Sequence, residues 1–469
     1  MLTRIELDGF KTFQNFKLEL ASFQVIIGGN GAGKSNLFDA LRLLSRLAQF
    51  PLDEAFQDPQ ARGSGRELFT LGYDNQSIPN MRIAVEMLLD HDLESILEPD
   101  APKYRRLRYE LTVTYSYTQL GLGQFYVAHE SLASIPREKD RWLNRYIGKN
   151  SAVGWPVSPV GPSKLFIETD QDQSAFLIHP DGEQSPVRQP LAIDGRGSTL
   201  LKFLSTPLFP HAYAVYQELT SCRFLLQLDP DVLRRPSPNL RREQLGIDGA
   251  GLAAVLARMQ AEDPSLLDDV SRDLANLVPG ALGVEVQTDE ARGESTVSVR
   301  MQDNRAFSSY VLSDGTLRLL ALITLKNDPH YRGMLCLEEP ENGVHPLRLK
   351  DLAQLLRALA TDFSDPGQAT EPLRQVLINT HSPALVSALS KTSGGRPEIV
   401  FAYMITHLPG EYQLPIRITH MVPVTADRRV RKELEIDDPE GAYTLKQVLD
   451  YLESTDTGEA SVLRGKTAR

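Results

Sequence analysis

The chain has 469 residues, 41% of them hydrophobic and 24% charged, with a formal net charge of −11 and two cysteines, Cys222 and Cys336. This composition predicts a folded protein with one large core or two to three smaller ones. It excludes a disulfide framework, a membrane-spanning run and a signal-peptide layout, so we expect a cytoplasmic protein without a membrane partner. The acidic balance argues against a surface that coats nucleic acid uniformly, because neutralising phosphates needs a concentrated positive face.

The first predicted elements are two strands within residues 5–20, with a turn at Lys11 and Thr12. An apolar strand over residues 23–27 follows, and leucines then recur at helical spacing from Leu37 to Leu47. The chain therefore passes from a buried strand into an amphipathic helix.

Between that strand and that helix lies the pattern Gly28-x4-Gly33-Lys34-Ser35, typical of a phosphate-binding loop (P-loop). Its glycines let the backbone curl until successive N–H groups converge on phosphate oxygens at a helix start, although a plain glycine turn is the alternative reading. Lys34 would neutralise the outer phosphates and Ser35 would hold Mg²⁺, so the pattern predicts binding of ATP with Mg²⁺. The candidate nucleotide-binding residues are Gly28, Gly29, Asn30, Gly31, Ala32, Gly33, Lys34, Ser35 and Asn36.

The middle of the chain changes character twice. Alternating apolar residues from 81 onward predict an antiparallel β meander, with a further hairpin over 164–179 and a loop over 148–162. Helical spacing returns from 198 to 277, but prolines divide it into short pieces, which excludes a long coiled coil.

The second half returns to strands followed by helices. The predicted elements are strands at 284–286 and 296–301, a helix from Leu312-Ser-Asp-Gly-Thr316 to Leu325, a strand at 334–337, a helix at 347–360, a strand at 375–378, and a helix after Asn379-Thr-His-Ser-Pro383. After Thr455 the tail is polar.

Two glutamates, Glu338 and Glu339, end the apolar strand at 334–337. In nucleotide hydrolysis one carboxylate holds Mg²⁺ and a second polarises the attacking water, because positioning and charge neutralisation supply most of the acceleration. We assign Glu338 to the metal and Glu339 to the water. A solvent-facing strand exit or a helix cap is the alternative for the isolated pair.

In this order the motifs resemble those of the ATP-binding-cassette heads of the RecF and SMC type, especially RecF-like predicted ATPases and the overcoming-lysogenization-defect (OLD) group. Gly9-Phe-Lys-Thr-Phe13 resembles the opening strand, residues 312–316 the signature, residues 337–343 the Walker B strand with its D-loop, and residues 379–383 the switch-histidine motif. Taken singly, Ser313 and Asp314 could only cap a helix and His381 could satisfy a carbonyl. His345 could merely start a helix with Pro346.

The resemblance implies a homodimer, or a higher even-numbered assembly, held together by ATP. Lys34, Glu339 and His381 of one chain would act in catalysis, with Ser35 and Glu338 on the metal. The signature residues Ser313, Asp314 and Gly315 would reach the γ-phosphate bound by the other chain, since a helix N-terminus favours that anion.

The implied fold is α/β: an ABC-type P-loop ATPase head with a mixed core sheet, an antiparallel β meander and a helical insert. We predict an N-terminal ATPase lobe at 1–195, a helical insert with the start of the second lobe at 196–300, a C-terminal ATPase half at 301–425, and a C-terminal helix with a tail at 426–469. Gln76 and Gln119 are candidates for the family's Q-loop glutamine. In the 88 residues after His381 the acidic run at 433–438 is polar rather than part of a strand, so we expect a partner, and not this chain, to supply any Toprim nuclease of the kind found in the OLD group.

Two functions fit these motifs. The first is an ATPase that acts on DNA in repair or anti-phage defence, for which basic clusters at 103–108, 137–145 and 428–432 could provide contacts. The second is an ATP-dependent switch or scaffold that regulates a partner effector protein, a nuclease or toxin, without touching DNA. A transporter motor fits poorly, because the meander and the insert exceed a compact transport cassette.

Overall fold

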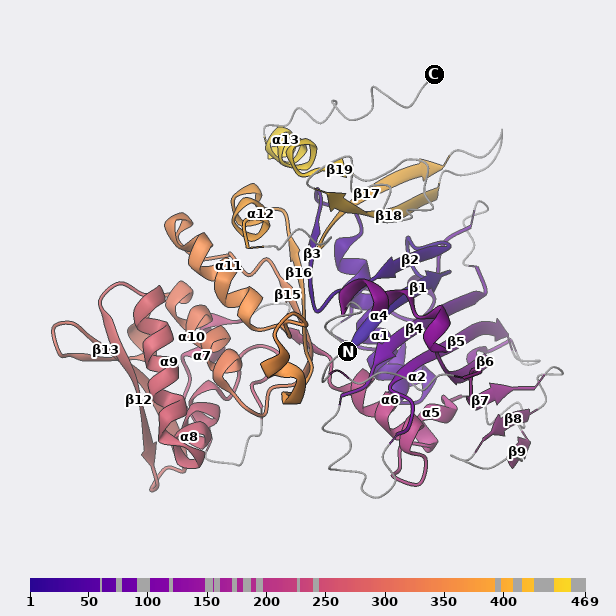
Figure 1. The fold of residues 1–469 in the computed structure, drawn as a ribbon, viewed down its shortest axis with the longest axis horizontal. Coiled ribbons are helices and arrows are strands. Elements are labelled where there is room, and N and C mark those ends of the chain that lie inside the picture. Colours follow the sequence, from indigo (N-terminus) through magenta and orange to yellow (C-terminus); the bar gives the residue numbers. More distant parts are fainter. Residues whose placement is uncertain are drawn as a thin grey trace.

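The computed structural model describes residues 1–59, 61–72, 78–90, 102–117, 121–147, 155, 161–170, 175–179, 187–190, 197–225, 228–238, 244–392, 398–407, 416–425 and 443–456. Figure 1 shows a helical lobe with α7 to α11, β12 and β13 on one side, and a lobe with α1 and a large antiparallel sheet on the other. A third group of elements, β17 to β19 with α13, lies above both in this view.

A seven-stranded mixed sheet forms the centre of the fold. Its strands, in spatial order, are β10 (Arg223–Leu225), β15 (Gly333–Glu338), β16 (Arg374–Thr380), β3 (Phe23–Ile27), β17 (Ile399–His407), β18 (Ile416–Thr425) and β19 (Tyr443–Thr444). The first five are parallel and β18 is antiparallel to β17. Since parallel strands end at the same edge, the segments after β3, β15 and β16 meet there.

Both faces of this sheet are buried, as expected of parallel strands. Alternate side chains of β15 enter different cores: Met334 and Cys336 join one cluster, and Leu335 and Leu337 join another. In β3, Ile26 joins the first cluster while Val25 and Ile27 join the second. The sheet is therefore the wall between two hydrophobic cores.

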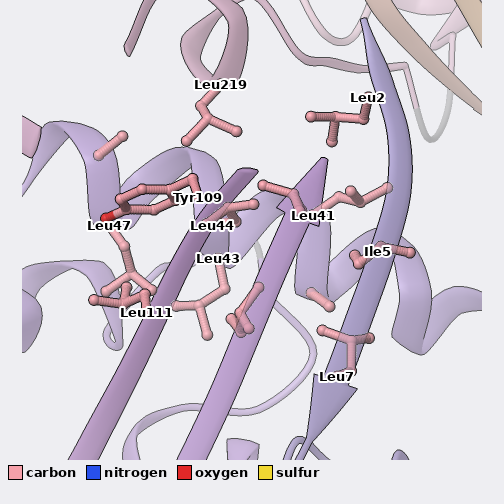
Figure 2. Close-up of a cluster of buried hydrophobic side chains, with 14 of the residues drawn as sticks. Leu2, Ile5, Leu7, Leu41, Leu43, Leu44, Leu47, Tyr109, Leu111 and Leu219 are labelled. Carbon is pink, nitrogen blue, oxygen red and sulfur yellow. The ribbon is translucent and has the colours of Figure 1, made fainter. Parts of the chain in front are cut away.

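An eight-stranded antiparallel sheet covers the first core. Its order is β2 (Phe16–Glu19), β1 (Leu2–Asp8), β4 (Asn80–Leu88), β5 (Arg106–Tyr117), β6 (Gly123–Ser134), β7 (Leu165–Thr169), β8 (Ala175–Ile178) and β9 (Val187–Pro190). Helix α1 (Lys34–Gln49) packs in the same core, where Leu41 and Leu44 lie among Leu2, Ile5 and Tyr109 (Figure 2). The predicted meander and hairpins are confirmed.

Helices and a small sheet surround these layers. Around the first core lie α2 (Leu52–Ala55), η1 (Gly65–Leu68), α5 (Leu200–Phe203) and α6 (Pro210–Thr220). After η2 (Arg137–Lys139), α4 (Arg141–Tyr146) packs in a separate, smaller cluster with Phe363 and Leu373. The other helices are α7 (Pro230–Leu233), α8 (Leu252–Glu262), α9 (Pro264–Leu277), η4 (Ser309–Val311), α10 (Asp314–Asn327), η5 (Pro346–Arg348), α11 (Leu349–Ala358), η6 (Pro366–Thr370), α12 (Pro383–Ser390) and α13 (Leu445–Asp456). The small sheet contains β11 (Ser237–Pro238), β12 (Ala281–Asp289), β13 (Glu294–Met301) and β14 (Ala306–Ser308).

The α/β class and the mixed core sheet agree with the sequence-based prediction, but two short strands, β10 and β11, lie within the range 198–277 predicted to be helical. Strand β10 extends the core sheet beside β15. It has only three residues, and its pairing with a strand more than 100 residues away stabilises it, which local helical spacing does not reveal. None of the helices in the described part of the chain has the length and apolar character of a membrane span.

A buried carboxylate, Glu130 of β6, ties the antiparallel sheet to α5. It accepts hydrogen bonds from Leu200 N (2.6 Å), Leu201 N (2.9 Å) and the Tyr109 hydroxyl (2.9 Å). Burial raises the pKa of Glu130 to about 7, although these hydrogen bonds favour the charged form. The carboxyl group therefore holds its proton more tightly in the folded chain than in the unfolded chain.

We expect the free energy of unfolding to fall as the pH rises from about 4.5 to about 7, by on the order of 3 kcal/mol, because the unfolded chain releases the Glu130 proton first. Urea unfolding followed across this pH range measures the slope. Glu130→Gln should flatten it, whereas Glu138→Gln, an exposed control on η2, should leave it unchanged. An identical slope in Glu130→Gln would assign the pH dependence to other groups.

Candidate nucleotide-binding site

The P-loop joins β3 to α1 and leaves the start of that helix open. Gly33 is the N-cap residue of α1, with a left-handed φ of 86°, no side chain caps the helix, and its first turn carries no acidic residue. Asn36 N donates to Gly33 O at 3.1 Å, whereas the N–H groups of Lys34 and Ser35 have no acceptor within their own helix and are available to an anion. A Cβ on Gly33 would lie 2.0 Å from Thr419 Oγ1, so β18 packs directly against the loop.

The Lys34 ammonium lies over the P-loop backbone. Its Nζ donates to the carbonyl oxygens of Gly28 at 2.6 Å and Gly29 at 2.9 Å. Burial lowers the pKa of Lys34, and the negative charges of Glu339 and Glu338 oppose that shift. The cation is thus held in the loop beside both carboxylates, where it can contact phosphate oxygens.

Ser35 and Glu338 meet at the carboxyl edge of the core sheet although 303 positions separate them. The Ser35 hydroxyl donates to Glu338 Oε1 at 2.5 Å, and Asn379 Nδ2 lies 3.3 Å from Ser35 Oγ and 3.2 Å from Glu338 Oε1. Arg62 donates to the other carboxylate oxygen of Glu338 at 2.6 Å. The structure therefore brings together the two residues predicted to hold the metal.

These oxygens suit Mg²⁺, which prefers hard oxygen ligands and keeps several waters and phosphate oxygens. Within the described residues, no group of three or more histidine, cysteine or acidic side chains could hold a metal alone. A hydroxyl and a single carboxylate are the ligand set expected where nucleotide phosphates complete the coordination.

Glu339 and His381 form a second pair next to the metal residues. His381 Nδ1 lies 2.7 Å from Glu339 Oε1, and Asn342 Nδ2 donates to Glu339 Oε2 at 2.9 Å. The Glu339 backbone adopts a left-handed φ of 49° and donates its N–H to Asn379 O at 2.8 Å. Such strain in a residue other than glycine often marks a functional site. The carboxylate is held by two partners in an orientation suited to accepting a proton.

The signature lies next to the D-loop of its own chain. Ser313 caps α10, accepting from Thr316 N at 3.2 Å, and a Cβ on Gly315 would lie 2.3 Å from Gly343 O. Arg318 of α10 donates to Asn342 O at 2.5 Å. In the described part of the chain, no hydrogen bond or ion pair joins Ser313 or Asp314 to the P-loop.

Sequence reasoning missed three polar residues around these motifs. Arg62 reaches Glu338 from the segment after α2, and Asn379 bridges Ser35 and Glu338. Arg234 follows α7 and donates to Asp314 Oδ1 at 2.5 Å and to Leu312 O at 3.2 Å, so it fixes the start of the signature helix. Of the three, only Asn379 could have been found from the sequence, because it begins the motif at residues 379–383 after the predicted apolar strand at 375–378.

The remaining residues singled out in the sequence lie in different places relative to the site. Lys11 of the opening motif donates to Asp39 Oδ2 at 2.6 Å and to Arg62 O at 2.6 Å, beside the site. His345 caps η5 by accepting from Leu347 N at 3.3 Å, which agrees with the helix-start reading. Gln76 and Gln119 lie outside the described residues.

Several arginines of the basic clusters at 103–108 and 137–145 form ion pairs with acidic residues of the same chain. Arg106 is fully buried and pairs with Asp140 at 2.7 Å, while Arg108 pairs with Glu6 at 2.9 Å. Burial alone would raise the pKa of Glu6. The guanidinium groups around Glu6 outweigh this effect and lower its pKa to about 2, and Arg108 has the largest part in that. Arg145 pairs with Glu19, and the cluster at 428–432 lies outside the described residues.

Two family models match the sequence. Residues 1–118 match "AAA ATPase domain", and residues 215–387 match "AAA domain, putative AbiEii toxin, Type IV TA system". The first range contains the P-loop, and the second contains Ser313, both glutamates and His381. Both segments are thus similar to AAA-family ATPase domains.

Solved structures of SMC heads are also similar to this chain, at low sequence identity. An SMC head bound to the C-winged helix domain of ScpA is 13% identical, with a TM-score of 0.49, covering 90% of this chain and 98% of that one. A head with an extended coiled coil from Pyrococcus furiosus, bound to the C-terminal domain of ScpA, is 12% identical, with a TM-score of 0.47 and coverage of 93% and 99%. The head from Thermotoga maritima is 13% identical, with a TM-score of 0.38 and coverage of 90% and 98%. No curated protein matches the sequence.

Proposed function

We propose that this chain is a Mg²⁺-dependent ATPase whose copies close in pairs around ATP. The observation that carries the proposal is the convergence of Ser35, Glu338 and Asn379 within 3.3 Å, from the ends of three different segments, beside the Glu339–His381 pair. Ion-pair networks alone rarely assemble a hydroxyl, two carboxylates, an ammonium and an imidazole at one open helix start. The matches to AAA ATPase domains support ATP binding and hydrolysis.

Each residue has a separate role in this proposal. Lys34 contacts the outer phosphates, and Ser35 with Glu338 holds the metal, which when bound neutralises charge on the transferred phosphoryl group. Glu339 accepts the proton of the attacking water, and His381 orients the Glu339 carboxylate through their 2.7 Å contact. The strained Glu339 backbone fixes the starting point of that side chain.

The paired arrangement rests on the position of the signature. Ser313, Asp314 and Gly315 begin α10 beside their own D-loop rather than their own P-loop. The start of α10 is thus left to a phosphate held by a second copy, since a helix N-terminus attracts an anion. The shared site then needs Lys34, Ser35, Glu338, Glu339 and His381 from one chain and the signature from the other.

Replacing Lys34 tests the nucleotide part of the proposal. Lys34→Ala removes the only ammonium bonded to the P-loop carbonyls in the described structure, so we expect ATP affinity to fall by at least about tenfold. Isothermal titration with a slowly hydrolysed ATP analogue measures the change. Lys164→Ala, at an exposed lysine before β7, is the matched control and should bind as the parent does. Equal affinity of Lys34→Ala and the parent would refute the assignment.

Two biological roles follow from the resemblance and the match. Action on DNA in repair or anti-phage defence is the first, as similarity to RecF-like and OLD ATPases implies. Regulation of a partner effector is the second, and the ion-pairing of Arg106, Arg108 and Arg145 favours it by removing cations from a phosphate-binding face. The description of one matching family names a toxin of a toxin–antitoxin system, which also fits an effector partner. DNA binding that weakens steeply with salt would support the first role, and no binding at low salt would support the second.

A further inference from the structure

A cavity of about 180 Å³ lies at the amino ends of β10 and β15. We call it the amino-end cavity; its lining includes Asp90, Gln217, Glu218, Arg223, Gln244 and Arg332. Gly333 begins β15 at this cavity, whereas Glu338 ends the same strand at the nucleotide site. Five residue steps separate the two ends by about 17 Å, so the amino-end cavity is distinct from the nucleotide site.

The guanidinium group of Arg223 is the most informative feature of this cavity. Its Nη1 atom is buried and has no hydrogen-bond partner among the residues that the structure describes, and its central carbon lies 5.6 Å from the centroid of the Tyr331 ring. Burial lowers the pKa of Arg223. Leaving a buried charged donor unpaired costs free energy, so a native structure with such a group calls for an acceptor. The stacked ring supports the guanidinium plane from one side.

Other donors lining the cavity are also unused. The side chains of Arg332, Gln217 and Gln244 have no hydrogen bond or ion pair with any residue of the described chain. Two arginines and two amides thus border one small space, and among the described residues we find no acceptor bonded to Arg332, Gln217, Gln244 or Arg223 Nη1. Arginine forks bind planar or tetrahedral oxyanions through paired hydrogen bonds, which makes an anion the fitting occupant.

The two carboxylates of the cavity already have partners. Glu218 forms an ion pair with the Met1 ammonium. Asp90 accepts from Leu373 N at 2.8 Å and lies close enough to Arg105 to interact with its charge. Neither carboxylate pairs with Arg223 or Arg332 in the described part of the chain. Asp328 is a third carboxylate close enough to act on the charge of Arg223, but its Oδ1 already pairs with Arg258 at 2.7 Å, so positive charge predominates in the cavity.

The shape of the cavity limits the size of its occupant. Gly333 has a left-handed φ of 83°, and a Cβ there would lie 2.3 Å from Ser221 Oγ, so glycine allows the close approach of the two segments that form the cavity wall. Cavities for drug-sized ligands measure roughly 300–1,000 Å³, well above the 180 Å³ found here. The space accepts an inorganic oxyanion or a group carrying few additional atoms, but not a nucleotide.

We propose that the amino-end cavity binds a phosphate group, either as free phosphate or as the ester of a small metabolite, between the guanidinium groups of Arg223 and Arg332. This site is separate from the P-loop and does not depend on the ATPase activity proposed above. The chemistry is non-covalent, and Gln217 and Gln244 supply further donors in the cavity lining.

Titration of the full chain with inorganic phosphate tests this proposal, carried out in the Lys34→Ala variant so that the P-loop contributes little. Isothermal titration should show one phosphate per chain. Arg223→Met and Arg332→Met should each weaken binding by at least tenfold, because each removes one guanidinium from the phosphate. Arg305→Met, at a largely exposed arginine before β14, should leave binding unchanged.

The other outcomes of these titrations show whether the ligand is free phosphate or a metabolite ester, and which results would overturn the proposed site. Tighter binding of glycerol 3-phosphate than of phosphate would identify a metabolite ester, and weaker binding would identify free phosphate. No phosphate binding in the Lys34→Ala chain, or equal binding after Arg332→Met, would overturn the proposal. Circular dichroism of each variant shows whether it is folded, and Arg332→Met, at the half-buried position, still tests the site if Arg223→Met fails to fold. Loss of phosphate binding leaves the nucleotide site untested, so the two proposals fail separately.

Discussion

Glu339→Gln should reduce ATP turnover by at least about 100-fold while leaving ATP binding intact, because an amide cannot accept the proton of the attacking water. Glutamine keeps the size of the side chain and can retain the contacts with His381 and Asn342. The variant should therefore stop after nucleotide binding. Phosphate release measures turnover, and gel filtration with ATP should show an accumulated dimer.

The control for this prediction is Glu371→Gln, at an exposed glutamate before β16, which should keep full activity. A Glu339→Gln protein that remained monomeric and fully active would remove Glu339 from the reaction. Lost turnover together with lost ATP binding would instead assign Glu339 to nucleotide binding.

Mixing two inactive variants should restore activity if the site is shared between chains. Ser313→Arg places a long cation at the start of α10 and removes its cap, so it should bind ATP but neither dimerise nor hydrolyse it. Lys34→Ala loses nucleotide binding but keeps an intact signature. Neither variant should close a dimer with itself, whereas the mixed dimer has one intact shared site of two, so we expect an equimolar mixture to regain up to about half of the parental activity.

A second mixture provides the matched control. Lys34 and Glu339 would serve the same composite site, so a dimer of Lys34→Ala with Glu339→Gln has no intact site and should stay inactive. Rescue in the first mixture and none in the second would support the division of residues between chains. Failure of both mixtures would contradict a signature acting on the partner's nucleotide.

The motifs could be predicted because each is local. The P-loop needs glycines at fixed spacing before a helix, and Glu338 and Glu339 directly follow an apolar strand, so residues 23–47 and 334–339 indicate both structure and chemistry. The structure then places Ser35 against Glu338, a contact that the shared edge of parallel strands makes expected. The cross-chain role of Ser313 stays a prediction.

What the sequence did not reveal depends on contacts between distant segments. Strand β10 is three residues long and is stabilised by pairing with β15, and the sequence analysis assigned no element to β17 or β18. Arg62 follows no motif, yet it reaches Glu338 from 276 positions away. Arg234 likewise contacts the signature from outside any recognisable pattern. A single arginine in a loop carries no periodicity from which such a contact could be inferred.

The hydrogen bonds of Lys34 to Gly28 O and Gly29 O make nucleotide entry an exchange of partners. The loop supplies its own internal acceptors, so incoming phosphate oxygens compete with two peptide carbonyls for the same ammonium protons. A hydrogen bond from a charged donor contributes roughly 1.5–3 kcal/mol, so part of the attraction between the ammonium and a phosphate is offset by breaking these bonds. The same two bonds tie the ammonium to the curved backbone at Gly28 and Gly29, so an arriving phosphate would meet a loop that is already curved and a cation that is already in place.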